Sequence, residues 1–322
     1  MYIKNIDVKN FTVFENLNMK FCKGINVFIG ENGTGKTHLM KMMYAPLSVK
    51  YDKSMMRFWE DIFTHNTDVE TVPHYFRRNK NKEFIINIDF DNAQSYCNND
   101  GNFSSAYYDI DSVFIPAKEM LSHSKGFLAL ERERHIPFDR TLIDIISKSE
   151  LGKSKRLDDL NMKILNHISN IIEGEVIYEN DTFYILKNNG LKIEFSMEAE
   201  GIRKIGILWQ LIRNGLINNK SILFWDEPEA NINPKFIPDL VEILIKLQTI
   251  GVQIFVTTHD YILSKYFDVK RSDNDEIMYF SLYRTDNGVE YECSTKLDNL
   301  KHNQIRDTFI QLYEDEIERA ME

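Results

Sequence analysis

At 322 residues, with 43% hydrophobic and 27% charged side chains, the chain has the size and composition of a globular protein with a substantial core. A net charge of −10 argues against general polyanion binding, and no apolar run approaches the roughly 20 residues of a membrane helix. Widely spaced cysteines without a Cys-x-x-Cys pair argue against a disulfide framework or a zinc site: Cys22, Cys97 and Cys293. The strand-like N-terminus does not resemble a signal peptide, so we expect a cytoplasmic protein with no membrane partner.

Apolar periodicity predicts strands that alternate with helices along the chain. Strands are expected at residues 2–9, 25–29, 83–90, 111–121 (broken by Pro116), 221–227, 251–260, 276–284 and 289–294. Helices are expected at residues 38–47, 58–63, 139–149, 155–173, 198–216, 234–249 and 304–320. Short strands separated by Asn-Asp and Asn-Asn-Gly turns predict a small antiparallel meander at residues 175–179, 182–187 and 191–196.

Three further segments have a weaker signal. The polar, turn-rich residues 91–105 predict an exposed loop. One basic cluster is more typical of a solvated face than of a nucleic-acid site: Arg77, Arg78, Lys80 and Lys82. The last helix is more typical of a packing helix than of a partner-docking one, and its apolar positions are Phe309, Leu312 and Ile317. The whole pattern predicts an α/β fold, with a single domain over residues 1–322 and an inserted helical and antiparallel region within residues 45–195.

A glycine-rich loop follows the apolar run at 25–29 and precedes the first helix. Residues 30–37 read GENGTGKT and match G-x-x-x-x-G-K-[ST] in full. Glycines let backbone N–H groups approach phosphates closely, and the following helix adds its positive N-terminal end. Lys36 is expected to reach the β- and γ-phosphates of ATP, and Thr37 to ligate Mg²⁺. The predicted nucleotide-binding residues in this region are Gly30, Asn32, Gly33, Thr34, Gly35, Lys36, Thr37 and His38.

Two buried strands end in residues suited to phosphate chemistry. Asp226 and Glu227 close the run SILFWDE, where a carboxylate can serve Mg²⁺ and its neighbour can activate water. His259 closes VQIFVTTH, and its imidazole can contact the γ-phosphate or the attacking water. A strand ending in solvated acids, or a surface histidine, is the ordinary alternative for each. Beside the loop, both indicate a hydrolytic site.

The loop, DEPEANINP and TTHD, in this order and spacing, resemble the ABC-type ATPases and more narrowly their SMC/RecF-like branch, with OLD-family relatives. The resemblance is good over residues 1–45 and 196–262, and it includes compact ATPases often encoded in phage-defence operons. It implies an ABC-type P-loop ATPase head with antiparallel N-terminal strands and a small inserted helical and β lid. It makes Asp226 the magnesium carboxylate, Glu227 the catalytic base and His259 the switch histidine.

The resemblance also implies a second copy of the chain that completes the site. Residues 230–233 match the dimer-facing loop, and Ala199, Glu200 and Gly201 match the signature segment that contacts the other copy's γ-phosphate. Relatives carry Ser where this chain has Ala199, so the hydroxyl contact is missing or comes from Ser196, while Arg203 and Lys204 can add charge. The glutamine loop has no Gln, and Lys118 or Glu119 can replace it. Phe11 or Phe14 can pack on adenine or in the core.

Three functions follow from these patterns. The first is an ABC-type ATPase that holds ATP between two copies, with Lys36, Glu227 and His259 as catalytic residues, in a DNA-linked or anti-phage process. No further catalytic constellation is recognisable, so any toxic output is expected from an effector of the same operon. The second, a transporter ATPase, predicts the absent Gln loop and Ser-Gly-Gly signature. The third is a weakly hydrolysing, nucleotide-gated scaffold, which Ala199 keeps open.

Overall fold

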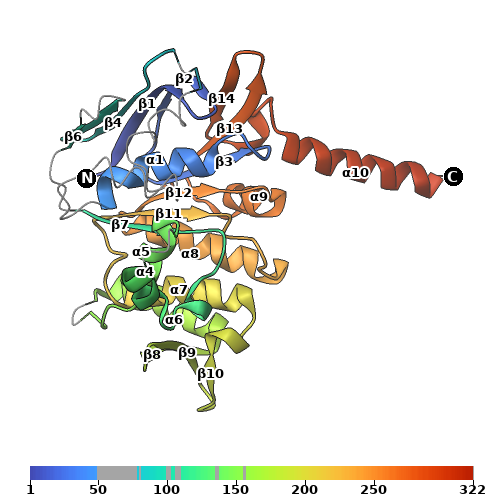
Figure 1. The fold of residues 1–322 in the computed structure, drawn as a ribbon. Helices are drawn as coiled ribbons and strands as arrows, with labels where there is room; N and C mark the ends of the chain where they lie inside the picture. The colour runs from blue at the N-terminus through green and yellow to red at the C-terminus, as the bar shows by residue number, and fades with distance from the viewer. Residues whose placement is uncertain are drawn as a thin grey trace.

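The computed structural model describes residues 1–48, 78–79, 81–98, 103–105, 110–134, 138–154 and 157–321. The helical pattern at 58–63 lies outside these residues, as do Arg77 and Lys80 of the basic cluster. The described elements form three sheets with helices packed around them (Figure 1). In these residues no helix is both long enough and apolar enough to cross a membrane.

The central sheet has six strands in the order β14-β13-β3-β12-β11-β7. They are β3 (Ile25–Gly30), β7 (Asp111–Ile115), β11 (Ser221–Asp226), β12 (Gln253–Thr257), β13 (Ile277–Thr285) and β14 (Gly288–Ser294). Neighbouring strands are parallel except for the antiparallel pair β13–β14. The carboxyl ends of β3, β11 and β12 therefore meet at one edge, where ligands bind in α/β sheets.

Helices cover both faces of this sheet, which explains the continuous apolar runs of its strands. Helix α1 (Lys36–Ser48) lies on one face, and α7 (Glu200–Arg213) and α8 (Ile237–Thr249) lie on the other (Figure 1). Alternate strand residues point to the α1 side, where Phe28, Phe224 and Phe255 pack together. The residues between them join a second core with α7 and α8. Because side chains alternate between the two faces of a strand, the same strands contribute to both hydrophobic cores.

Two antiparallel sheets flank the central one. The N-terminal sheet has the order β2-β1-β4-β5-β6, formed by β1 (Ile3–Phe11), β2 (Phe14–Lys20), β4 (Ile85–Phe90), β5 (Gln94–Asn98) and β6 (Phe103–Ser105). The meander predicted at 175–196 is confirmed as β8 (Gly174–Glu179), β9 (Thr182–Lys187) and β10 (Lys192–Glu194). Residues 45–195 thus contribute strands to all three sheets.

The remaining helices are short, apart from the last. They are α4 (Phe127–Arg134), α5 (Arg140–Ser149), α6 (Asp159–Ile172), α9 (Tyr261–Lys270) and α10 (Gln304–Met321), with single 3₁₀ turns η1 (Leu121–His123), η2 (Phe195–Met197), η3 (Pro234–Phe236) and η4 (Leu297–Asn299). Three helices follow an aspartate whose carboxylate accepts a backbone N–H of the first turn: Asp139, Asp158 and Asp260. This is the usual helix N-cap, and Asp260 fixes the start of α9 directly after His259.

The prediction of an exposed loop at 91–105 was wrong, because β5 and β6 lie within it. Ser95 and Cys97 of β5 are buried, and β5 pairs with β4 from Ile85↔Asn98 to Asp89↔Gln94. Pairing with β4 therefore outweighs the low strand propensity of these polar residues. Three further elements, β2, α4 and α9, were not predicted from the sequence pattern.

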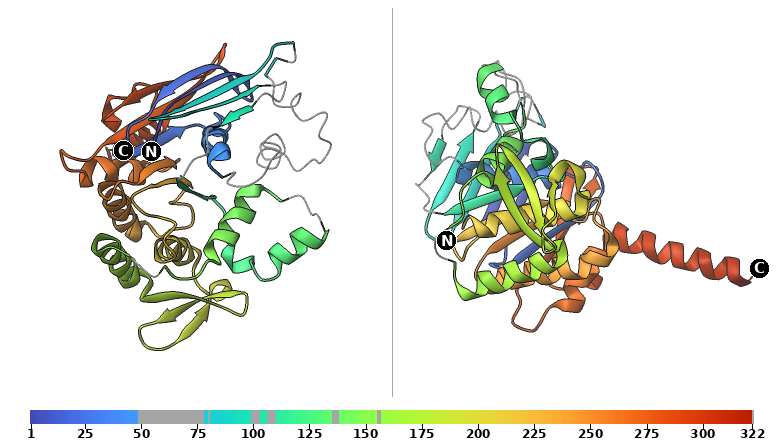
Figure 2. Two further views of the ribbon diagram at one scale, coloured as in Figure 1. Left: turned by 90° about the vertical axis from the view of Figure 1, so that its left-hand side faces the viewer. Right: turned by 90° about the horizontal axis from the view of Figure 1, so that it is seen from below.

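The terminal helix α10 is present as predicted, but the expectation that it packs was wrong. None of its side chains within 304–321 is buried, and it projects away from the body (Figures 1 and 2). Phe309, Leu312 and Ile317 are 46%, 57% and 42% exposed. Only the first part meets the body, where the Phe309 ring stacks on Tyr261 of α9 at 4.8 Å between centroids. Its apolar stripe is therefore an exposed surface.

Candidate functional site

The glycine-rich loop of residues 30–37 joins β3 to α1 in the predicted strand–loop–helix context. Gly30 and Gly35 have φ angles of +140° and +88°, which side chains disfavour. A Cβ on Gly30 would lie 2.2 Å from the Leu282 carbonyl oxygen, and one on Gly35 would lie 2.6 Å from Val13 Cγ2. The loop is therefore wedged between β13 and the N-terminal sheet, and only glycine fits at these two points.

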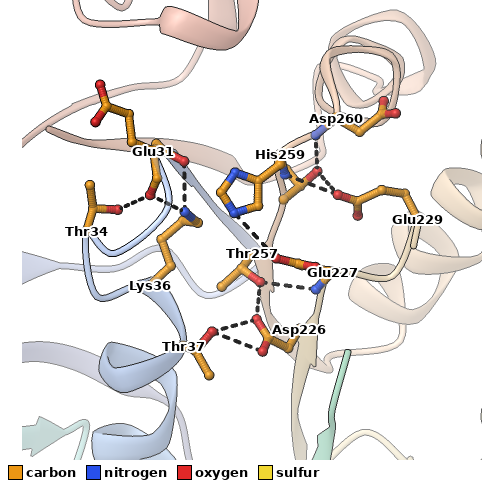
Figure 3. A network of polar contacts seen from close by, with 12 residues as sticks. Glu31, Thr34, Lys36, Thr37, Asp226, Glu227, Glu229, Thr257, His259 and Asp260 are labelled. Atoms are coloured by element: carbon orange, nitrogen blue, oxygen red, sulfur yellow. Dashed lines mark hydrogen bonds and ion pairs between the residues drawn. The ribbon is translucent and has the colours of Figure 1, made fainter. Parts of the chain in front are cut away.

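Lys36 is folded back into this loop. Its Nζ donates to the carbonyl oxygens of Gly30 at 2.8 Å and Glu31 at 2.9 Å, as Figure 3 shows for Glu31. The side chain is almost fully buried, and this burial lowers its pKa to about 8, against the opposing effect of nearby carboxylates led by Glu227. The ammonium therefore lies where the backbone of the loop can also present N–H groups to an anion.

Asp226 ends β11 among hydroxyl groups. Thr37 Oγ1 lies 3.1 Å from Oδ1 and 3.0 Å from Oδ2, and the Thr257 hydroxyl on β12 donates to Oδ1 (Figure 3). The side-by-side pairing Asp226↔Thr257 places these groups together. A hydroxyl and a carboxylate facing each other are oxygen ligands of the kind Mg²⁺ prefers. The described residues hold no group of three or more His, Cys, Asp or Glu side chains for a metal, and Mg²⁺ commonly takes its other ligands from phosphates and water.

Glu227 and His259 face each other just beyond the paired strand ends. His259 Nε2 lies 3.4 Å from Glu227 Oε1, and both side chains are about one-third exposed. The backbone of Glu227 is left-handed, with φ +46°, and its N–H is shared between the carbonyl (3.2 Å) and the hydroxyl (3.1 Å) of Thr257. Burial first, and then Lys36, lower the pKa of His259, so the neutral imidazole is favoured. A neutral ring can donate one hydrogen bond and accept another.

The structure brings Lys36, Thr37, Asp226, Glu227 and His259 together, but it does not bring the signature segment to them. Ala199 is the N-cap residue of α7, which lies on the opposite face of the sheet from α1 (Figure 1). A Cβ on Gly201 would lie 2.9 Å from Ile232 Cα, so this segment packs against residues 230–233. Glu200 begins the helix. In one chain, these two segments therefore lie against each other.

Two residues considered for roles at the nucleotide are paired with each other instead. Arg203 Nε lies 3.2 Å from Glu119 Oε2, and Glu119 is nearly fully buried. Glu119 Oε1 also accepts the Ser122 N–H at 3.0 Å. Within one chain the two side chains thus bind each other, and their roles at a nucleotide stay predictions. Ser196 Oγ donates to Glu194 at 2.6 Å.

Other predicted residues are placed as follows. Lys204 is buried, and its Nζ lies 3.4 Å from the Glu227 carbonyl oxygen, so it contacts the site of its own chain through the Glu227 backbone. Phe11 and Phe14 are buried in the core beside the N-terminal sheet, which favours the core alternative over an adenine contact. His38 follows the loop on α1, and its side chain is exposed.

Sequence reasoning missed two side chains that surround the site. Arg284 of β13 donates from Nη2 to the Asn32 carbonyl oxygen at 3.1 Å, and this Nη2 lies 2.6 Å from where a Cβ on Gly33 would be. Glu229 accepts hydrogen bonds from Thr258 Oγ1 at 2.6 Å and from the His259 N–H at 3.1 Å (Figure 3). Only the second left a signal in the sequence, as a third acid in the run DEPE beside the Thr-Thr-His strand end.

Comparison with known proteins agrees with this architecture. The family described as "AAA domain, putative AbiEii toxin, Type IV TA system" matches residues 57–264, more than half of the chain. The DNA replication and repair protein RecF of Clostridium novyi is 50% identical over 44 residues, which are 14% of this chain and 12% of that protein. RecF of Bacillus thuringiensis is 29% identical over 132 residues, 39% of this chain and 34% of that protein. The chain thus spans about a third or less of these relatives.

A solved structure gives the same result for the fold. An SMC head bound to the C-winged helix domain of ScpA superposes with a TM-score of 0.52 at 12% identity, covering 92% of this chain and 99% of that one. The predicted fold class is confirmed by this likeness and by the parallel sheet that carries the loop. The chain has the fold of an SMC/RecF-like, ABC-type P-loop ATPase and belongs to the family described as "AAA domain, putative AbiEii toxin, Type IV TA system".

Proposed function

We propose that this chain binds ATP with Mg²⁺ and hydrolyses it, in a homodimer that holds the nucleotide between two copies. One observation carries the proposal. A buried lysine in a glycine-rich loop, a hydroxyl–carboxylate pair and a Glu–His pair come from three separate segments and converge at one edge of the sheet (Figure 3). Each group has a place in phosphoryl transfer to water.

The geometry supports a role for each of these residues. Lys36 exchanges the loop carbonyls for the β- and γ-phosphates, and the loop N–H groups bind the same oxygens. Thr37 and Asp226 hold Mg²⁺, which when bound neutralises phosphate charge. Glu227 takes the proton from the attacking water, and His259 donates a hydrogen bond to the γ-phosphate or to that water. The lowered pKa of His259 is compatible with this role, because the neutral imidazole keeps one N–H that can be donated.

The homodimer is supported by the position of residues 199–201 in a single chain. Ala199, Glu200 and Gly201 lie at the start of α7, a helix that covers the opposite face of the central sheet from α1 (Figure 1). A helix N-terminus presents free N–H groups and a partial positive charge, which suit the γ-phosphate of a nucleotide bound to a second copy. Ala199 offers no hydroxyl. A weakly hydrolysing, nucleotide-gated scaffold therefore remains the second candidate.

The process served is proposed from the relatives. The curated relatives are named DNA replication and repair proteins, and the family description refers to a toxin of a toxin–antitoxin system. We place the chain in a DNA-linked or anti-phage process in which a separate effector protein acts. A transporter ATPase subunit is less well supported, because it predicts a glutamine loop and this chain has no Gln there. Glu119, considered as the substitute, forms an ion pair with Arg203 of α7.

Steady-state hydrolysis of Mg-ATP, with and without DNA, tests this proposal, together with the mass of the protein in solution with and without ATP. Turnover and an ATP-dependent doubling of mass are expected. Stimulation by DNA would support a DNA-linked role, whereas turnover unaffected by nucleic acid would support regulation of a protein partner. ATP binding with no turnover would favour the scaffold. Absence of ATP binding would contradict both.

Binding of ATP is also expected to depend on pH through Lys36. The pKa of its ammonium is lowered to about 8 without nucleotide, and phosphate anions raise it. Above pH 8 the Lys36 amine of the free protein is increasingly neutral, so binding of ATP takes up about one proton. The affinity for ATP therefore falls about tenfold for each further pH unit. Calorimetry at pH 9 in two buffers of different ionisation enthalpy measures the uptake. Lys36→Arg stays charged and should show none; equal affinity for wild type at pH 7.5 and 9.5 would contradict the expectation.

A further inference from the structure

Glu229 joins the turn that carries His259 to the segment that carries Glu227. One oxygen, Oε1, accepts from Thr258 Oγ1 at 2.6 Å and from the backbone N–H of His259 at 3.1 Å (Figure 3). The Thr258 hydroxyl in turn accepts the Asp260 N–H at 2.9 Å. A single carboxylate therefore organises the three residues between the end of β12 and the start of α9.

These contacts extend the pairing of two strands into the site. The register of β11 and β12 ends at Asp226↔Thr257. One residue further, the Glu227 N–H binds Thr257, and beyond Pro228 the Glu229 carboxylate binds the His259 backbone. The imidazole of His259 then lies back over Glu227, with Nε2 3.4 Å from Oε1. The distance between the proposed base and the histidine is thus set by backbone that Glu229 holds.

Burial of the Glu229 carboxylate carries an energetic cost. Its second oxygen, Oε2, is buried, and no described residue donates a hydrogen bond to it. Burial raises the pKa of this carboxyl to about 7, partly offset by the hydrogen bonds from Thr258 and His259. A buried acceptor without a donor is rare in folded proteins and calls for a reason. Holding His259 in place gives that reason.

We propose that Glu229 is a positioning residue for ATP hydrolysis, which acts through the Thr258–His259 turn to hold the imidazole beside Glu227. It touches neither the nucleotide nor the water. The inference rests on the proposed ATPase activity and assigns a function to the third acid of DEPE. Because small misplacement of a reacting group lowers a rate steeply, Glu229→Ala is expected to reduce kcat about 10- to 100-fold while KM for ATP changes little.

Three comparisons separate positioning from general destabilisation. Glu229→Gln keeps an acceptor oxygen of the same reach and is expected to restore most of kcat. Thr258→Val removes one donor without changing the shape of the side chain, and should give a smaller loss. Glu229→Ala added to His259→Ala should slow turnover no further than His259→Ala alone, because both remove the same element. Glu242→Ala, on α8 and paired with Lys246 and Lys270, is the control for loss of a distant carboxylate.

A measurement independent of turnover completes the test. In protein labelled at histidine, the imidazole resonance of His259 is identified by its loss in His259→Ala. It is expected to shift or broaden in Glu229→Ala and to return in Glu229→Gln. An unchanged resonance, or additive losses of kcat in the double variant, would overturn the proposal. If wild type hydrolyses no ATP, the proposed activity fails, and the resonance still reports whether Glu229 positions His259.

Discussion

Glu227→Gln is expected to slow ATP hydrolysis by about 10²- to 10⁴-fold, the usual contribution of a general base. The amide keeps the shape of the carboxylate but cannot take a proton from water. The left-handed backbone at Glu227 and its N–H bonds to Thr257 do not involve the side chain, so the fold of the turn is retained. ATP should therefore bind and stay unhydrolysed, and the ATP-dependent dimer should persist. Single-turnover hydrolysis and mass in solution with Mg-ATP measure both effects.

Glu31→Gln is the matched control for this variant. Glu31 is an exposed acid of the glycine-rich loop, and it contributes a backbone carbonyl, not its carboxylate, to the Lys36 contact. Its loss changes the charge near the nucleotide by the same amount, and turnover should stay close to that of wild type. Wild-type turnover in Glu227→Gln would remove the proposed base. Loss of ATP binding in the same variant would instead assign Glu227 to nucleotide recognition.

The parts of the site that sequence could predict are those written in consecutive residues. The glycines, lysine and threonine of the loop at 30–37 follow a fixed spacing that is visible in the sequence. They lie between a strand and a helix, as predicted. Asp226 and His259 follow apolar runs, and parallel pairing of β3, β12 and β11 explains why both strand ends reach the loop. Local pattern and the geometry of parallel sheets were sufficient here.

What could not be predicted depends on which strands become neighbours. Arg284 lies over the loop because β13 pairs with β3 from Ile277↔Ile25 to Leu282↔Gly30, and nothing near Arg284 in the sequence indicates this register. The hydroxyl of Thr257 reaches Asp226 for the same kind of reason. Strands β5 and β6 form on a template that lies elsewhere in the chain, so their polar sequence predicted a loop.

The terminal helix shows a different limit of sequence reasoning. Amphipathic spacing indicates that a face will be covered, but it does not say by what. In α10, Ile305 at the base is half-buried against the core, whereas Phe309, Leu312 and Ile317 are exposed, and Phe309 stacks on Tyr261. A groove at the base of α10 is lined by Gly30 of the glycine-rich loop, by His259 after β12 and by Phe309 of α10 itself. The helix thus begins next to the proposed nucleotide site, although its periodicity alone predicted packing within the chain.

Lys36→Met is expected to weaken binding of Mg-ATP by about 30-fold or more, the range found when one partner of a buried charge pair is removed. Methionine has a similar length but no charge and no donor. The triphosphate would then meet the loop N–H groups and the helix N-terminus without the ammonium that lies 2.8 Å from Gly30 O. Titration calorimetry measures the affinity. Thermal unfolding measures it independently, because a ligand that binds the folded state stabilises it by RT ln(1 + c/Kd), where c is the free ligand concentration, and thereby raises Tm.

Lys220→Met is the control, because this lysine is exposed and lies immediately before β11, at the opposite end of the strand from Asp226. Its affinity for Mg-ATP should equal that of wild type. Unfolding without nucleotide is compared first, since Lys36→Met also leaves two loop carbonyls without their donor. A folded Lys36→Met protein whose Tm rises with ATP as much as that of wild type would show that the nucleotide binds elsewhere. The convergence of Asp226, Glu227 and His259 on this loop would then need another ligand.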